Sequence, residues 1–179
     1  MNKVLVIYFS NYGTTKRYAE WIATDLNGDI YSINNFRQID MAKYHTIILG
    51  SGLYAGKIQG IDLFIKNYEI IKDKKLIIFT CGIADYSKPG NISAIYKRIE
   101  IALPKGILEK IKIFYLRGGI DYKKLSIIHK IMMWLMKKMV MKKEIENIDE
   151  EHIEFMETYG KIIDFTNRDN ISDIKTYCK

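Results

Sequence analysis

Residues 3–15 read Lys-Val-Leu-Val-Ile-Tyr-Phe-Ser-Asn-Tyr-Gly-Thr-Thr. The segment Lys3–Phe9 is short, mostly apolar and rich in β-branched residues, and it stops at a Ser-Asn-Tyr-Gly turn. This pattern is typical of a buried strand in a parallel sheet. From Thr14 to Leu26 the apolar residues recur at helical spacing, and the stripe ends at Asn27-Gly28. A strand, a tight turn and a helix are therefore predicted in direct succession.

Four further apolar segments have the character of strands and alternate with helical periodicity. The strands are expected at residues 29–33, 45–49, 75–80 and 111–116, and the helices at 58–71, 92–103 and about 149–165. Short strands that alternate with helices indicate an α/β protein whose parallel sheet carries helices on both faces. Five strands fit the doubly wound order 2-1-3-4-5, in which ligands bind beyond the carboxyl ends of the strands, at the switch between strands 1 and 3.

Length and composition favour one globular domain. Of the 179 residues, 48% are hydrophobic and 27% are charged. We expect a single domain over 1–179, with an insertion at about 119–147 and a polar tail at about 167–179. The first apolar run is too short for a signal peptide or a membrane span, which predicts a cytoplasmic protein. Isolated cysteines (Cys81 and Cys178) and scattered histidines indicate neither a disulfide framework nor a metal site.

The turn after the first strand has the chemistry of a phosphate-binding loop. A helix N-terminus offers unpaired backbone N–H groups and a positive dipole end, which suit an anion. Ser10, Thr14 and Thr15 add hydroxyl groups, and Gly13 lets the backbone approach closely. The alternative is an ordinary helix cap with a turn glycine. The loops at 50–57 and 80–88 fall at the same end of the predicted sheet.

Other nucleotide-binding motifs fit poorly. The P-loop pattern Gly-x-x-x-x-Gly-Lys-Ser/Thr is absent. The glycines at 50, 52 and 56 miss the dinucleotide spacing by one residue and follow the wrong strand. A response-regulator receiver would need acids at the ends of strands 1 and 3, where the chain has Phe9-Ser10 and Leu49-Gly50. These three classes are therefore set aside.

The loop Ser10–Thr15 resembles the flavodoxin signature, Thr/Ser-x-Thr/Ser-Gly-x-Thr. It matches at Ser10, Gly13 and Thr15, and it has Tyr12 where a small hydroxylated residue is usual. The sheet order extends this resemblance over roughly residues 1–117, and implies a flavodoxin-like fold with a basic helical insertion before the last helix. Residues 115–122 (Tyr-Leu-Arg-Gly-Gly-Ile-Asp-Tyr) and the Met- and Lys-rich stretch 127–143 are similar to the menaquinone-dependent protoporphyrinogen IX dehydrogenases, flavodoxin-fold enzymes with a long insertion there.

The resemblance implies an FMN cofactor held by three loops. The phosphate would be cradled by Ser10, Asn11, Tyr12, Gly13, Thr14 and Thr15. The isoalloxazine ring would be flanked on one side by Ser51, Gly52, Leu53, Tyr54, Ala55 and Gly56, and on the other by Cys81, Gly82, Ile83, Ala84, Asp85 and Tyr86. Tyr54 and Tyr86 are candidates to stack on the ring, unless each simply covers its loop. Cys81 is interpreted first as a small apolar core residue. No acid–base residue stands out, so the catalytic residues are left unknown.

Charge is distributed unevenly along a chain whose formal net charge is +7. Residues 122–143 contain seven lysines and no acid, and residues 144–157 contain seven acids and no Lys or Arg. A helix through the basic stretch carries lysines on one side and a broad Ile/Met/Leu face opposite. Such a helix suits an anionic membrane surface, or a quinone or porphyrin partner. The alternative is packing on its own domain or in a homodimer. Nucleic acid is not an expected partner, since no basic cluster with stacking aromatics is present.

Three functions remain. The leading hypothesis is an FMN-dependent oxidoreductase that oxidises a porphyrinogen-type or other reduced organic substrate with a quinone or other acceptor. The second is a non-catalytic flavodoxin that carries electrons between redox proteins, although the acidic surface usual for such carriers is missing. The third is a flavin-free scaffold, which requires the phosphate loop to be accidental.

Overall fold

The computed structural model describes the chain except residues 1–2, 36–38, 55–56, 144–147 and 149. The chain separates into two compact units: residues 1–118 with 166–179, and residues 119–165. The second unit begins where the insertion was expected and continues through Phe165.

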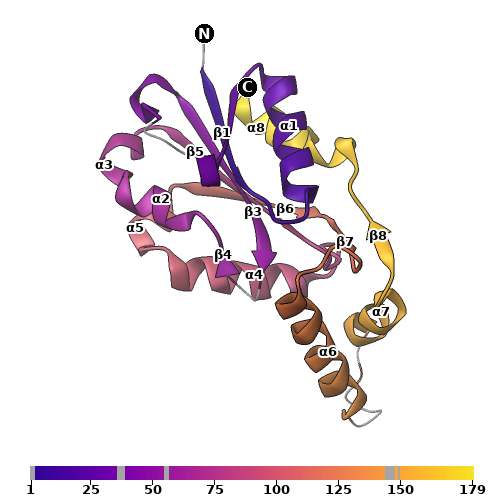
Figure 1. Ribbon diagram of the computed structural model, residues 1–179. Coiled ribbons are helices and arrows are strands. Elements are labelled where there is room, and N and C mark those ends of the chain that lie inside the picture. The colour runs from indigo at the N-terminus through magenta and orange to yellow at the C-terminus, as the bar shows by residue number, and fades with distance from the viewer. Residues whose placement is uncertain (1–2, 36–38, 55–56, 144–147, 149) are drawn as a thin grey trace. The chain divides into compact units, whose positions relative to one another are not determined.

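The first unit is built on a parallel sheet of five strands. Its strands are β1 (Val4–Phe9), β2 (Asp29–Ser32), β3 (Thr46–Tyr54), β5 (Lys75–Gly82) and β6 (Ile111–Arg117). They pair in the order β2-β1-β3-β5-β6 (Figure 1). Taken in chain order this is 2-1-3-4-5, so the predicted doubly wound, flavodoxin-like fold is confirmed. A short strand, β4 (Lys57–Ile58), turns back and pairs antiparallel with the end of β3.

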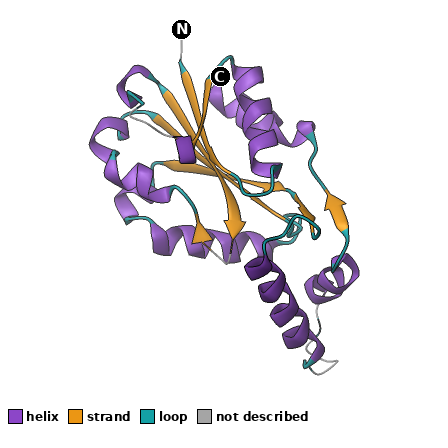
Figure 2. Cartoon of the chain, viewed as in Figure 1, coloured by secondary structure: helices purple, strands orange, loops and turns teal. Residues whose placement is uncertain are grey.

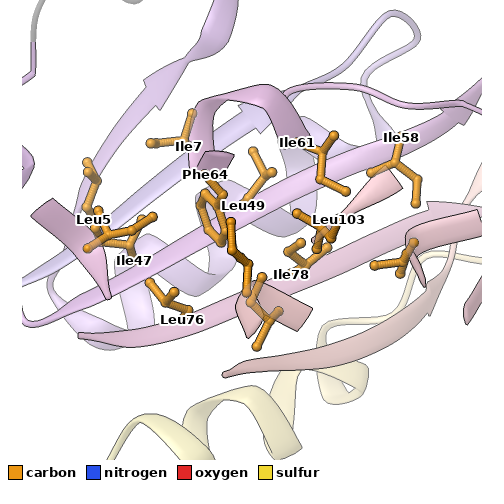
Figure 3. Packing of buried hydrophobic residues seen from close by; sticks show 14 of the residues in the cluster. Leu5, Ile7, Ile47, Leu49, Ile58, Ile61, Phe64, Leu76, Ile78 and Leu103 are labelled. Carbon is orange, nitrogen blue, oxygen red and sulfur yellow. The ribbon is translucent and has the colours of Figure 1, made fainter. Parts of the chain in front are cut away.

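Alternate residues of the strands face two separate core layers, because successive side chains point to opposite faces of a sheet. On β1, Leu5 and Ile7 face the first layer, whereas Val4 and Val6 face the second. Figure 3 shows the first layer, where Phe64 packs with sheet residues such as Leu5 and Leu49. Near-continuous apolar strands are therefore explained by burial on both faces.

Helices cover both faces of the sheet (Figure 2). The first layer is closed by α2 (Ile61–Lys66), α3 (Tyr68–Ile71), α4 (Pro89–Ala102) and α5 (Lys105–Leu108), and the second by α1 (Thr14–Leu26) and α8 (Ser172–Cys178). Short 3-10 helices are η1 (Ile33–Asn35), η2 (Met41–Lys43) and η4 (Arg168–Ile171). The single helix expected at 58–71 is divided at Asn67 into α2 and α3.

The C-terminal segment corrects the prediction of a polar tail. Ile171, Ile174 and Cys178 are buried in the second core layer. These residues recur at helical spacing and form a narrow apolar stripe. Most residues between them are polar, so the composition of the segment alone predicts a tail. Arg168 and Lys175 both form ion pairs with Asp25 of α1. The tail is thus a structural part of the first unit.

Over its described residues, the second unit contains two helices and a two-stranded ladder. Its elements are β7 (Gly119–Asp121), α6 (Ile127–Met141), α7 (Glu150–Thr158) and β8 (Ile162–Asp164). β7 and β8 pair antiparallel, with Gly119 opposite Asp164. The helix expected at about 149–165 is therefore wrong in its second half, because Gly160 takes a left-handed φ of +80°, the conformation that commonly ends a helix. Of the helices in the described ranges, none is long and apolar enough to cross a membrane.

Candidate functional site

The turn between β1 and α1 presents backbone donors at a helix start. Gly13 is the N-cap of α1 with a φ of +96°, and no side chain caps the helix there. The Gly13 N–H donates to Ser10 Oγ at 3.1 Å, which closes the turn. A β-carbon at Gly13 would meet nothing within 4 Å, so the left-handed conformation, not crowding, requires glycine. The first turn of α1 thus retains N–H groups for an anion.

Thr15 adds a buried hydroxyl beside this turn. Its side chain is fully buried in the first turn of α1, and its Oγ1 has no hydrogen-bond partner among the described residues. A buried polar atom left unpaired costs about 1–3 kcal/mol, and such atoms in native proteins call for an explanation, such as a ligand. Together with the uncapped N–H groups, this hydroxyl makes a donor set that fits a phosphoryl group.

Thr14 connects the turn to the ends of two other strands. Cys81 Sγ donates to Thr14 Oγ1 at 3.6 Å. Gly118 follows β6, and its N–H donates to the Gly82 carbonyl at 2.6 Å. A β-carbon at Gly118 would lie 2.7 Å from Cys81 Sγ and 3.2 Å from Thr14 Oγ1. Three loop ends therefore converge here, and only glycine fits at position 118. The sequence predicted no role for Gly118 beyond its place in the stretch 115–122.

The end of β3 lies at the same edge of the sheet, and this strand continues to Tyr54 instead of stopping at residue 49 as expected. Ser51 is fully buried, and its hydroxyl accepts from the Gln59 N–H at 2.8 Å and donates to the Gly52 carbonyl at 3.1 Å. This hydroxyl is thereby used to hold the return into β4. Gly52 is also buried and pairs with Cys81 of β5. The predicted site residues Ala55 and Gly56 lie outside the described residues, and so does the Tyr54 side chain, so its stacking role stays a prediction.

The loop after β5 accepts hydrogen bonds from three residues, Ser87, Asn91 and Arg117. Asp85 accepts from the Ser87 N–H and from the Ser87 hydroxyl, which lowers the pKa of the Asp85 carboxyl. Asn91 of α4 donates to the Asp85 carbonyl at 2.8 Å. Arg117 Nε, at the end of β6, donates to the Ile83 carbonyl at 3.1 Å. Ile83, Ala84 and Asp85 are half-buried in this held loop.

Tyr86 joins the two loops that were expected to flank the ring. Its ring packs against Tyr115 at a centroid distance of 5.8 Å and a tilt of 45°. A β-carbon on Gly82 would lie 2.7 Å from the Tyr86 hydroxyl and 3.2 Å from Leu53 Cδ1. The Tyr86 hydroxyl is buried and has no partner among the described residues, and burial raises its pKa. The structure thus brings Leu53, Gly82 and Tyr86 together, whereas stacking by Tyr86 stays a prediction.

Tyr18 fixes α1 against the end of β6 and the C-terminal segment. Its hydroxyl donates to the Arg117 carbonyl at 2.8 Å and accepts from the Asn167 N–H at 3.2 Å and from Asn170 Nδ2 at 3.4 Å. Tyr18 itself is fully buried. Sequence reasoning placed it only in an apolar helical stripe; a tyrosine in a buried stripe is the signal that a polar partner is needed.

A pocket lies between the loop that follows β5 and the end of β6. Its volume is about 400 Å³, and it is lined by Asp85, Tyr86, Ser87, Tyr115, Arg117, Asp169, Asn170, Ser172 and Asp173. Carboxylates, hydroxyls and one guanidinium dominate this lining, so the pocket suits a polar group with several hydrogen-bond donors. The C-terminal residues of the lining come from the segment that was expected to be a tail. Within the described ranges, no three His, Cys, Asp or Glu side chains are grouped to hold a metal ion.

Comparison with known proteins identifies related chains. The flavodoxin domain family model matches residues 5–147, well over half of the chain. An uncharacterised protein of Methanocaldococcus jannaschii is 34% identical over 82 residues, which cover 45% of this chain and 55% of that protein. The chain therefore matches about half the length of this curated relative.

Solved structures share the fold. A putative flavoprotein from Bacteroides eggerthii is 19% identical, with a TM-score of 0.50 over 76% of this chain and 97% of its own. A flavodoxin, WrbA-like protein from Agrobacterium tumefaciens is 17% identical, with a TM-score of 0.48 over 69% of this chain and 88% of its own. Likeness at such low identity concerns the fold alone.

Proposed function

The chain belongs to the flavodoxin domain family, whose members bind FMN, and from this premise we propose that it is an FMN-dependent oxidoreductase. The net reaction would move a pair of hydrogens from a reduced organic substrate to a quinone or another acceptor. FMN supplies the electron exchange when it is bound, while the protein binds it, orients it and sets its surroundings.

The unpartnered Thr15 hydroxyl is the observation that carries this proposal. It lies in the first turn of α1, next to a loop whose Gly13 conformation leaves the helix N-terminus uncapped. A phosphate would accept hydrogen bonds from Thr15 and from backbone N–H groups at the start of α1, which removes the cost of burying that hydroxyl. The Thr14–Cys81 and Gly118–Gly82 contacts would keep the neighbouring loops in place.

The two remaining loops would hold the ring. The loop of residues 51–56 would contact one side and the loop of residues 81–86 the other. Hydrogen bonds from Asn91 and Arg117 restrict the second loop, so little conformational entropy would be lost there on binding. The adjacent pocket of about 400 Å³, with Arg117 and several carboxylates, is the place where a polar substrate would meet the ring edge.

A narrower assignment is a protoporphyrinogen-dehydrogenase-like enzyme. Support comes from residues 115–122 and from the position of the second unit, which is inserted between β6 and the C-terminal segment. A quinone acceptor would then bring the protein to the inner face of the membrane, through the basic helix expected over 122–143. The rival for that helix is an interface in a homodimer.

The alternative function is electron transfer between proteins without catalysis. One observation favours it: among the described residues of the two ring loops, Asp85 is the single carboxylate, and its Oδ1 accepts two hydrogen bonds from Ser87. A carrier needs no proton-transferring side chain, whereas an oxidase of a C–H or N–H substrate gains from one.

Flavin loading and turnover separate these functions. The purified chain, reconstituted with FMN, should be yellow and should release FMN on denaturation. Oxidation of a porphyrinogen with a quinone acceptor should then be measurable under anaerobic conditions. Tight FMN binding without turnover on any acceptor would favour the carrier. A protein that takes up no flavin at saturating FMN would contradict both functions.

A further inference from the structure

Helix α6 has two sides with different surroundings within the second unit. One side carries Met132, Met133, Lys137 and Val140, which are half-buried. Lys137 Nζ lies 4.5 Å from the ring centroid of Tyr159. Tyr159 in turn packs against Tyr122 and Phe155, at 5.2 and 5.9 Å. This inner side therefore already has its packing partners in the unit.

The opposite side of α6 is apolar and open. Ile127 is 77% exposed, Ile128 71% and Met139 62%, and Ile131 and Leu135 are each about half exposed. Ile127, Ile131, Leu135 and Met139 follow one another at a spacing of four residues, so they form one row, with Ile128 beside it. We call these five residues the outer face. Single exposed apolar residues are normal, but a contiguous row of large ones indicates an interaction surface.

Lysines lie on and beside the outer face, and Lys138, which is three residues after Leu135 and seven after Ile131, falls within it. Lys130 and Lys138 are exposed on α6, Lys142 is exposed as its C-cap, and the whole stretch 122–143 contains no acid. Lys138 Nζ lies 4.3 Å from the ring centroid of Trp134, which is itself 46% exposed. A tryptophan with a lysine above it is typical of side chains at a membrane interface, where the ring lies at the level of the headgroups.

We propose that the outer face of α6 docks on an anionic lipid bilayer. The aliphatic row would enter the boundary between headgroups and acyl chains, and Lys130, Lys138 and Lys142 would contact the lipid phosphates. A protein groove would explain the apolar row but gives no reason for α6 to carry lysines and no acid. The helix would lie in the plane of the surface. This inference deepens the proposed function, since a lipid-soluble quinone would be reached from there, but the docking itself needs no flavin.

Vesicle binding of the full chain tests this proposal. The protein should sediment with vesicles of phosphatidylcholine and phosphatidylglycerol, and far less with phosphatidylcholine alone. Ile131→Gln with Leu135→Gln, or Lys130→Glu with Lys138→Glu, should weaken binding about tenfold or more. The matched controls are Ile70→Gln with Ile101→Gln and Lys97→Glu with Arg98→Glu, at exposed positions of α3 and α4. Each control pair changes the net charge by the same amount as its test pair and replaces side chains of the same kind, and binding should stay within about twofold.

The environment of Trp134 gives a second measurement. The chain has two tryptophans, Trp21 and Trp134, so a Trp21→Phe background reports on Trp134 alone. Its emission should shift to the blue on adding anionic vesicles and should be quenched by brominated lipid. Equal binding to neutral vesicles, no binding at all, or equal losses in the control pairs would overturn the proposal. So would a dimer that the Ile131/Leu135 variant converts to monomer. FMN uptake, measured in the same preparations, shows separately whether the proposed function fails.

Discussion

The Tyr86 hydroxyl lies directly over Gly82, 2.7 Å from the position that a β-carbon on that glycine would occupy. The hydroxyl is buried there without a partner among the described residues. Its ring, by contrast, is held by Tyr115. Burial of the unpartnered hydroxyl therefore destabilises this arrangement of Tyr86, and the packing of its ring against Tyr115 stabilises it.

Tyr86→Phe should stabilise the flavin-free protein. Removing a buried hydroxyl that lacks a partner removes its desolvation cost, and we expect the free energy of unfolding to rise by about 1 kcal/mol. Urea denaturation followed by far-ultraviolet circular dichroism measures this change.

Tyr18→Phe is the matched control, since it removes the same atom from another buried tyrosine. Here the hydroxyl contacts Arg117, Asn167 and Asn170. The same substitution should lower the free energy of unfolding by about 1–3 kcal/mol, because it leaves three polar groups without this partner. Equal and same-signed effects at both positions would contradict the assignment of an unpaired hydroxyl at Tyr86.

Thr15→Val should weaken FMN binding and leave the flavin-free protein intact. The substitution keeps the shape of the side chain and removes the unpartnered hydroxyl. A lost hydrogen bond to a charged phosphate is worth about 1.5–3 kcal/mol, so the dissociation constant for FMN should rise about tenfold or more. Titration of flavin fluorescence measures it.

Thr80→Val controls for the loss of a buried threonine hydroxyl. Thr80 is also fully buried, and its Oγ1 also lacks a partner among the described residues. It lies on β5, outside the residues expected to hold the phosphate. The FMN affinity of the Thr80→Val variant should therefore stay within about twofold of that of the wild type. If Thr80→Val weakened binding as much as Thr15→Val, the phosphate site would be misplaced.

The sheet and its loops were predictable because their signals are local. Strands such as Val4–Phe9 are buried on both faces, so they appear as continuous apolar runs. The carboxyl ends of parallel strands meet at one edge, so the loops at Ser10, Ser51 and Cys81 had to lie together. Their flavin contacts remain predictions, since the contacts that position a ring depend on the cofactor.

The rest depends on contacts between residues distant in the sequence. The Ser51 hydroxyl accepts a hydrogen bond from the Gln59 N–H, eight residues away, while its expected place beside the ring stays a prediction. Tyr18 and Asn167 are 149 residues apart and share one hydrogen bond. No local pattern predicts such pairs. The spacing of Ile171, Ile174 and Cys178 predicts a helix with one buried side, although the composition of the segment is polar.

Asp25 should make the stability of the first unit depend on pH. Its carboxylate accepts hydrogen bonds from Lys175, at 2.7 Å, and from Arg168, at 2.5 Å, and both lower its pKa. A group whose pKa is lower in the folded state stabilises the fold above its ordinary pKa, and this contribution is lost as the pH falls through the lowered value. Asp25→Asn should therefore lower the melting temperature at neutral pH, and the difference from wild type should vanish in acid.

Salt provides the independent check on that ion-pair network. Raising the ionic strength at neutral pH should narrow the gap between wild type and Asp25→Asn, because the pairs lie near the surface and are screened. Asp40→Asn is a suitable control. Among the ion pairs described, Asp40 forms one with Lys43, three residues further along the chain. A melting-temperature difference for Asp25→Asn that is constant with pH would show that the carboxylate charge is not involved.

Ile174→Ala should destabilise the first unit as a core substitution does. Ile174 is fully buried between α8 and the sheet, although it lies in a segment whose composition is polar. Replacing a buried isoleucine by alanine costs about 2–5 kcal/mol. Tyr177→Ala, at a 41% exposed position one turn further along α8, should cost less, because much of its side chain is already in water. Equal effects of the two substitutions in urea denaturation would mean that α8 contributes to the fold through its polar contacts, and not through this buried stripe.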